Sequence, residues 1–279
     1  MCIRDSYLTA DHRLMLEKAE EILVGIKILM HALHVSRAII GIENNKKDAI
    51  DLFRNLVPRD AGIQIAALRV KYPQGGEKQL VRALLKREVP KNGLPLDVGV
   101  VVHNVGTVFA IYQAVQHNRP LIERVVTVTG KKLENPSNFW VRIGTPISDL
   151  LAEVGGVPEN TRKIVSGGPM MGKALKNTDV PVTKGTSGIL VIPGEEANRG
   201  TPRNCIRCGE CVDVCPMGLE PHLLMNLTEK TMFEKAAQED ILTCIECGSC
   251  SYVCPSHRPL LDYIRFGKTM AKQLESNQG

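Results

Sequence analysis

Aromatic residues and long apolar runs are both scarce in this sequence of 279 residues. Only 4% of the residues are Phe, Trp or Tyr, and no run combines them with clustered basic side chains. This scarcity argues against a protein that binds nucleic acid. No stretch approaches the roughly 20 apolar residues that are needed to span a bilayer, so no transmembrane helix is expected.

Cysteine is almost absent from the first 200 residues and then becomes dense. Eight of the nine cysteines lie between residues 205 and 254. A disulfide framework would be spread over the whole fold, so this crowding indicates metal chemistry in a reducing compartment. Charge is also uneven, because residues 1–200 hold 27 Lys and Arg against 20 Asp and Glu. Such a surplus suits either an anionic cofactor or an ordinary solvated surface.

The cysteines form two runs with one spacing, C-x2-C-x2-C-x3-C followed by proline, and the second repeats the first 39 residues later. Three thiolates spaced three residues apart can hold one face of a [4Fe-4S] cluster, while the fourth reaches the neighbouring cluster. The expected ligand sets are Cys205, Cys208, Cys211 and Cys254 for one cluster, and Cys244, Cys247, Cys250 and Cys215 for the other. Zinc is the alternative, but zinc sites favour two C-x2-C pairs separated by a longer gap.

Helices are expected around these two runs. Residues 221–242, which separate the runs, carry apolar side chains at helical intervals. We therefore predict an α-helical dicluster ferredoxin domain over residues 201–266, with clusters at helix ends. Gly209 and Gly248 occupy the same place in both runs, where a small residue lets backbone amides approach the cluster sulfurs.

The larger N-terminal part alternates apolar strands with helical stretches. Residues 10–34 have a 3.6-residue apolar period, with Asp11 as the expected N-cap. Strands are expected near 36–42, 63–70, 97–103 and 124–130, and helices near 46–56, 77–88 and 106–115. This alternation predicts an α/β domain with a parallel sheet over residues 7–121.

Three polar loops follow these strands, at the edge of the sheet where such folds bind ligands. They contain Glu43-Asn44-Asn45, then residues 72–78 with the pair Gly75-Gly76, then residues 103–107. Glycine at a helix start exposes amide N–H groups to an anion, and the helix dipole adds to the attraction. None of the loops is a G-x-G-x-x-G or Walker motif. A flavin or dinucleotide phosphate site and ordinary turns are both compatible with them.

Beyond residue 121 the pattern changes to short strands around one helix. Residues 122–178 predict a small α+β unit, and residues 179–200 one more strand and a polar linker into the cysteine region.

The order of these motifs resembles the C subunit of the Rnf (also called Rsx) ion-translocating electron-transport complex. The resemblance rests on YLTADHRLMLE at 7–17, IGIENNK at 40–46, YPQGGEKQL at 72–80, HNVGT at 103–107, GGPMMG at 167–172, GTSGILV at 185–191 and the doubled cysteine motif. The α/β part is also similar to the flavoprotein subunit of respiratory complex I, in which analogous loops help to hold FMN beside NADH. Residues 122–178 resemble the soluble-ligand-binding β-grasp module of both families.

The resemblance implies a cleft for FMN and NAD(H). The residues expected in it are Asp11, Glu43, Asn44, Gly75, Gly76, Glu77, Lys78, Asn104 and Thr107. Members of the family carry a longer segment before YLTAD, including a glycine-rich flavin loop, whereas Tyr7 here follows MCIRDS. We therefore expect a truncated product with a spurious leader of six residues.

The function that the resemblance implies is electron transfer on the NADH side of a membrane-associated complex. FMN would exchange a hydride with NADH and single electrons with the two [4Fe-4S] clusters. Further subunits and a ferredoxin-type partner would couple this transfer to ion movement. The protein would dock peripherally on the cytoplasmic face of the bacterial inner membrane. The alternatives are a non-catalytic iron-sulfur adaptor that binds neither flavin nor NADH, and a zinc-stabilised interaction protein.

Overall fold

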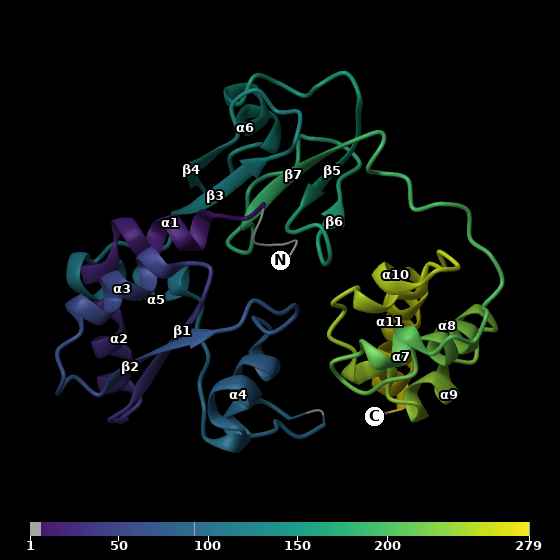
Figure 1. Ribbon diagram of the computed structural model, residues 1–279, viewed down its shortest axis with the longest axis horizontal. Coiled ribbons are helices and arrows are strands. Elements are labelled where there is room, and N and C mark those ends of the chain that lie inside the picture. Colours follow the sequence, from purple (N-terminus) through teal and green to yellow (C-terminus); the bar gives the residue numbers. More distant parts are fainter. Residues whose placement is uncertain (1–6, 92, 279) are drawn as a thin grey trace. The chain divides into compact units, whose positions relative to one another are not determined.

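The computed structural model describes residues 7–91 and 93–278, which form two compact units (Figure 1). Unit 1 comprises residues 7–88 and 95–197, and unit 2 comprises Val89–Leu94 and residues 198–278. The expected six-residue leader lies outside the described residues. Each unit is described by itself.

The first part of unit 1 is the α/β region that the sequence predicts. Its elements are α1 (Ala10–Glu17), α2 (Ala19–Ala32), β1 (Ala38–Glu43), α3 (Lys47–Leu56), β2 (Ile63–Leu68), α4 (Glu77–Leu85), the 3-10 turn η1 (Pro95–Val98) and α5 (Val105–His117). Strands β1 and β2 pair in parallel, with Ala38 opposite Ile63 and Glu43 opposite Leu68.

Helices cover both faces of this strand pair. Ile22 of α2, Ile42 of β1 and Phe53 of α3 are buried in one core, and each such side chain contributes roughly 1.5–3 kcal/mol when removed from water. On the other face, Gly41 has no side chain, so Leu80 and Leu84 of α4 approach the strand backbone.

Three details of the sequence-based prediction for this region were wrong. Residues 97–103 form no strand, because they begin in the 3-10 turn and continue through Gly99, whose φ of +69° interrupts an extended backbone. Among the described residues the sheet therefore has two strands. The expected helix over 10–34 is divided at Lys18 into α1 and α2, and Thr9, not Asp11, is the N-cap of α1.

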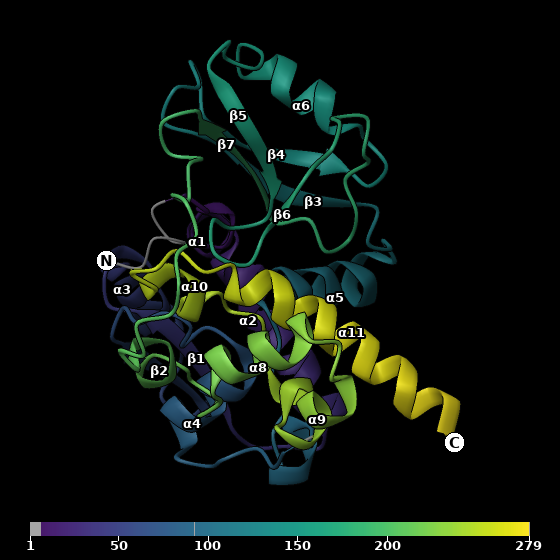
Figure 2. The same cartoon turned by 90° about the vertical axis from the view of Figure 1, so that its right-hand side faces the viewer.

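The second part of unit 1 is a five-stranded sheet with one helix against it (Figure 2). Its elements are β3 (Glu123–Thr129), β4 (Ser137–Arg142), α6 (Ile147–Glu153), β5 (Thr161–Ser166), β6 (Lys173–Ala174) and β7 (Gly188–Pro193). The strand order is β4-β3-β7-β5-β6, and only the β3–β7 pair is parallel. The predicted division at residue 178 separates β7 from this sheet, whereas the structure places β7 in its middle.

The start of α1 is anchored on this sheet by buried Thr127 of β3. The Thr127 hydroxyl accepts the backbone N–H groups of Thr9 and Ala10 at 3.2 and 3.0 Å, and donates to Asn138 Oδ1 at 2.7 Å. N–H groups at a helix start have no partner within the helix. The YLTAD segment therefore joins the two parts of unit 1.

Helices α2 and α5 approach each other closely at Gly25. A Cβ atom there would overlap the carbonyl oxygen of Val108. We expect Gly25→Ala to lower the free energy of unfolding by about 1–3 kcal/mol. Urea unfolding followed by the fluorescence of Trp140, the single tryptophan, reports on unit 1 because its ring lies 5.7 Å from Phe109 of α5.

Gly185→Ala is the matched control for this substitution. A Cβ atom at Gly185 would find its nearest neighbour, Thr183 Oγ1, at 4.0 Å. Equal urea midpoints for the two variants would show that the α2–α5 contact tolerates a methyl group.

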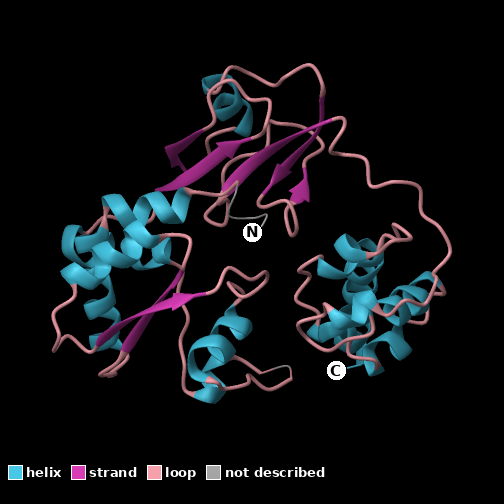
Figure 3. Cartoon of the chain, viewed as in Figure 1, coloured by secondary structure: helices cyan, strands magenta, loops and turns pink. Residues whose placement is uncertain are grey.

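Unit 2 consists of helices and loops in its described residues (Figure 3). Its elements are α7 (Glu210–Asp213), α8 (Pro221–Glu229), α9 (Phe233–Gln238), the 3-10 turn η2 (Ile241–Thr243), α10 (Ser249–Val253) and α11 (Leu260–Gln278). Leu224, Ile241 and Ile264 form the centre of its core. No helix in the described part of the chain has the length and apolar character to cross a bilayer.

Candidate functional site

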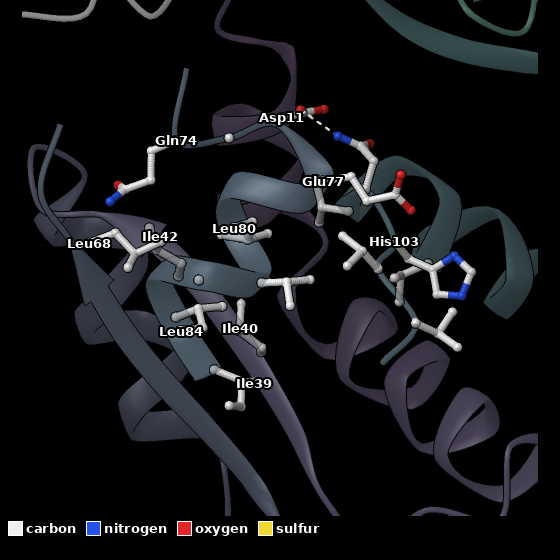
Figure 4. Close-up of a pocket in the computed structure, with 18 of the residues that line it drawn as sticks. Asp11, Ile39, Ile40, Ile42, Leu68, Gln74, Glu77, Leu80, Leu84 and His103 are labelled. Carbon is white, nitrogen blue, oxygen red and sulfur yellow. Dashed lines mark hydrogen bonds between the residues drawn. The ribbon is translucent and has the colours of Figure 1, made fainter. Parts of the chain in front are cut away.

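Unit 1 contains a pocket of about 1670 Å³. Apolar side chains of β1, β2 and α4 form its inner wall, and polar side chains of the loops after β1, before α4 and before α5 form its rim (Figure 4). The turn 166–172 of the second sheet also lines it. A deep apolar pocket with few polar groups is the usual form of a cofactor site.

Five of the nine residues predicted for the flavin cleft line this pocket. They are Asp11, Glu43, Gly75, Glu77 and Asn104. The other four, Asn44, Gly76, Lys78 and Thr107, lie in the same loops or at the adjoining helix starts but are not among its lining residues.

Asn104 links two of the elements at the rim. Its side-chain oxygen accepts the backbone N–H of Gly106 at 2.8 Å and so caps α5. Its amide nitrogen donates to Asp11 Oδ2 of α1, also at 2.8 Å (Figure 4). Helix α5 therefore presents the positive end of its dipole at the pocket rim, next to a fixed carboxylate.

Gln74 is a pocket residue that the sequence did not single out. Its amide oxygen is buried and has no hydrogen-bond partner among the described residues, although the side chain lines the pocket (Figure 4). Leaving such an acceptor unsatisfied costs about 1–3 kcal/mol. The pocket has room for a flavin, and its apolar wall suits the ring system of that cofactor.

The eight cysteines of unit 2 are all free thiols. Burial raises the pKa of Cys211, and the charges of three further thiols raise it more, those of Cys254, Cys205 and Cys208. Burial, the largest cause, and the charges of Cys244, Cys247 and Cys215 together raise the pKa of Cys250 to about 12. The thiols that influence one another thus form two groups of four, and each group takes its fourth member from the other run.

A small cavity of about 20 Å³ lies inside the second group. Cys215, Cys244, Cys247 and Cys250 all line it, together with apolar residues of α8 and α11. Cys247 and Cys250 are buried, whereas Cys205 and Cys208 of the first group are exposed. The two groups therefore differ in their access to solvent.

Backbone amides approach the sulfurs in the same way in both runs. The N–H of Arg207 points to Cys205 Sγ and that of Glu246 to Cys244 Sγ, each at 3.4 Å. Both residues have left-handed backbones, with φ of 58° and 56°. Gly209 and Gly248 follow at φ of 83° and 81°, a conformation that glycine adopts without strain. The repeat in sequence is thus a repeat in backbone geometry.

The donor set fits two [4Fe-4S] clusters, since it offers two groups of four thiols with amide donors to their sulfurs. Among the residues that the structure describes, no three His, Cys, Asp or Glu side chains are arranged to hold a single metal ion. That finding does not bear on a cluster, because four sulfurs around one zinc ion lie closer together than four sulfurs around a cubane.

Helix α11 places two cations beside the second group. Lys268 Nζ donates to the carbonyl oxygen of Cys244 at 2.5 Å and to Glu246 Oε1 at 3.2 Å. Arg265 Nε donates to Glu246 Oε2 at 3.1 Å. The sequence offered one signal for this arrangement, since Arg265 and Lys268 are three residues apart and so share a helix face.

Three family models match consecutive parts of the chain. The Nuo51 FMN-binding domain matches residues 2–113, the SLBB domain residues 125–174, and the 4Fe-4S dicluster domain residues 197–255. The α/β region, the five-stranded sheet and the helical unit therefore correspond to three known kinds of domain. The predicted fold class is confirmed.

Solved structures with this fold include an NAD+-reducing [NiFe]-hydrogenase. In its H2-reduced state the TM-score is 0.60 at 16% identity, over 94% of this chain and 53% of that chain. In its air-oxidized state the TM-score is 0.58 at 14% identity, over 94% and 57%. At these identities the likeness concerns the fold alone.

Curated relatives are much more similar in sequence. The chain is 47% identical to the C subunit of the proton-translocating ferredoxin:NAD(+) oxidoreductase complex of Clostridium ljungdahlii, over 95% of this chain and 58% of that protein. It is 45% identical to the Na(+)-translocating counterpart of Acetobacterium woodii, over 95% and 60%. It is 45% identical to the C subunit of the ion-translocating oxidoreductase complex of Yersinia pseudotuberculosis, over 97% and 39%. The chain thus spans between about two fifths and three fifths of the length of these relatives, and over that span it is similar in sequence to C subunits of ion-translocating oxidoreductase complexes.

Proposed function

We propose that this chain carries electrons between NAD(H), an FMN held in unit 1 and two [4Fe-4S] clusters held in unit 2. The observation that carries the proposal is that Cys215 of the first run lines one small cavity with Cys244, Cys247 and Cys250 of the second, on a chain that also matches an FMN-binding type of domain. An FMN accepts a hydride from a nicotinamide and releases electrons singly. The protein's part is to bind and orient these groups.

In the pocket of unit 1, the flavin ring would lie against the apolar wall, and the rim would hold its polar groups. The phosphate suits the amide-rich starts of α4 and α5, where Gly75, Gly76 and Thr107 lie. Glu43 and Glu77 at this rim offer acceptors for hydroxyl and amide donors, and Lys78 and Asn44, which adjoin the rim, would add a cation and a further acceptor. Asn104 would keep Asp11 and α5 in fixed positions.

In unit 2, Cys205, Cys208, Cys211 and Cys254 would hold one cluster, and Cys244, Cys247, Cys250 and Cys215 the other. Crossed ligation brings the two clusters close together, as an electron relay requires.

We further infer peripheral attachment to other subunits of a membrane complex, on the cytoplasmic face of the bacterial inner membrane. The support for this is the family, since the relatives are named as subunits of ion-translocating complexes. Their names also support NAD(H) and ferredoxin as redox partners of the whole complex.

The proposal is tested by anaerobic reconstitution with iron, sulfide and FMN, followed by titration with NADH. Bleaching of the broad iron-sulfur absorbance by NADH would support the whole scheme. Bleaching by dithionite but not by NADH would leave the iron-sulfur adaptor as the function of this chain. A colourless protein after reconstitution would contradict both.

The flavin pocket has its own test in Gln74. We expect Gln74→Met to raise the Kd for FMN about tenfold, because the substitution removes the polar amide of a pocket-lining side chain at nearly constant volume. Fluorescence titration with FMN measures the change. Gln64→Met, at an exposed position of β2, is the control, and an equal effect of both substitutions would contradict this role for Gln74.

A further inference from the structure

The two cysteine runs repeat each other in backbone but not in surroundings. Arg207 stands in the first run where Glu246 stands in the second, 39 residues later, and both have the same left-handed backbone. In the second run, Glu246 meets Arg265 and Lys268 of α11. The Glu246 carboxylate thus connects the loop of the second run to α11.

The matching loop of the first run is open. Every residue from 201 to 210 is exposed, including the thiols Cys205 and Cys208. Ile206 is 67% exposed, whereas Ile245, its counterpart in the second run, is half-buried. Tyr252, two residues before Cys254, is 66% exposed. Exposed apolar side chains therefore adjoin two ligands of one cluster.

Charge distinguishes the two loops further. Helix α11 covers the loop of the second run with cations that pair with a carboxylate. The loop of the first run carries Arg203 and Arg207 instead, so a surface that covers it in the same way must present carboxylates. Arg203 is held in place through its backbone N–H, which donates to the carbonyl oxygen of Ser256 at 2.9 Å, beside Cys254. Basic residues around a small apolar contact favour fast, transient association with an acidic partner.

We propose that the loop 203–208 is the docking surface for an acidic electron-carrier protein. It exchanges one electron at a time with the cluster held by Cys205, Cys208, Cys211 and Cys254. In one direction, the reduced cluster loses one electron and the oxidised carrier gains it, with no bond made or broken. The loop is small, as weak redox encounters require. The inference rests on the proposed function only in requiring that these cysteines hold a cluster.

The test uses the full chain with reconstituted clusters, reduced with dithionite and freed of excess reductant. The probe is an acidic plant-type [2Fe-2S] ferredoxin, whose spectrum differs from that of a [4Fe-4S] cluster. Stopped-flow mixing measures the rate of electron transfer to it. We expect Arg207→Glu to lower this rate on the order of tenfold at low salt, because the substitution reverses a steering charge. Arg207→Lys keeps the charge and should keep the rate.

The backbone of the loop accepts this change, because glutamate already occupies the same conformation at Glu246. Lys235→Glu, at an exposed position of α9 in the same unit, is the control for net charge. Equal rates for the parent chain and Arg207→Glu, or equal losses in Arg207→Glu and Lys235→Glu, would overturn the docking surface.

Spectroscopy of the same samples separates this inference from the proposed function. Electron paramagnetic resonance counts the reduced clusters in each variant before mixing. If two clusters are present and Arg207→Glu leaves the electron-transfer rate unchanged, the proposed docking surface is wrong and the electron-carrying function stands. If no clusters form in the parent chain, the proposed function fails, and the inference fails with it.

Discussion

A chain with both Cys205→Ala and Cys254→Ala is expected to keep about half of the iron of the parent chain. Both thiols belong to one group, so the second substitution removes a ligand from a cluster that the first has already destroyed. Each single substitution should therefore have nearly the same effect as the pair. Iron and sulfide analysis after anaerobic reconstitution measures the loss, and electron paramagnetic resonance identifies the remaining cluster.

The matched pair is Cys244→Ala with Cys254→Ala. These two cysteines occupy the ends of one run but belong to different groups, so their combination should remove both clusters. Ligation within each run predicts the reverse, with half of the iron kept in the Cys244 and Cys254 pair and none in the Cys205 and Cys254 pair. The iron contents of the two double variants therefore distinguish crossed ligation from ligation within each run.

Replacing Lys268 with methionine is expected to lower the potential of the second cluster by about 50–90 mV. A unit charge about 8 Å from the added electron, at an effective dielectric constant near 20, contributes about 2 kcal/mol, and 1.4 kcal/mol corresponds to 59 mV for one electron. The Lys268 cation stabilises the reduced cluster, so its loss disfavours reduction. A redox titration followed by electron paramagnetic resonance measures the shift.

Two further variants test the sign and the location of this effect. Glu246→Gln removes the carboxylate between Lys268 and Arg265, so it should raise the same potential. Lys272→Met, one turn further along α11 and exposed, should change it little because solvent screens the charge. A shift of equal size in the Lys268 and Lys272 variants would attribute the effect to net charge, not to contact with Cys244.

The helical dicluster type of the cysteine region could be predicted from the sequence because the spacing of the cysteines constrains it. A repeated C-x2-C-x2-C-x3-C run leaves few ways to place eight thiols, and proline after the last cysteine turns it away from the first three. Gly209 and Gly248 occupy equivalent places in the repeated run, which is why both have a similar positive φ.

The sheet of unit 1 could be predicted only in part, because local pattern does not report tertiary pairing. Residues 100–102 are three valines with high strand propensity. Val101 is nevertheless 40% exposed, and it belongs to neither of the two sheets in the described chain. Strand β7 was recognised as a strand, but its partners β3 and β5 are distant in the sequence. Gln74 escaped notice because an unsatisfied acceptor is a property of burial, which residue type does not reveal.

The crossing of the two cysteine groups has a consequence for synthesis and unfolding. The second group is complete only when Cys250 has left the ribosome and the first only when Cys254 has, so no cluster with four protein ligands can form on a nascent chain that ends before Cys250. Once loaded, the two clusters close chain loops that contain α8 and α9, which lowers the entropy of the unfolded state as any cross-link does. The clusters thus act as cross-links within unit 2, and we expect α8 and α9 to unfold together when iron is lost.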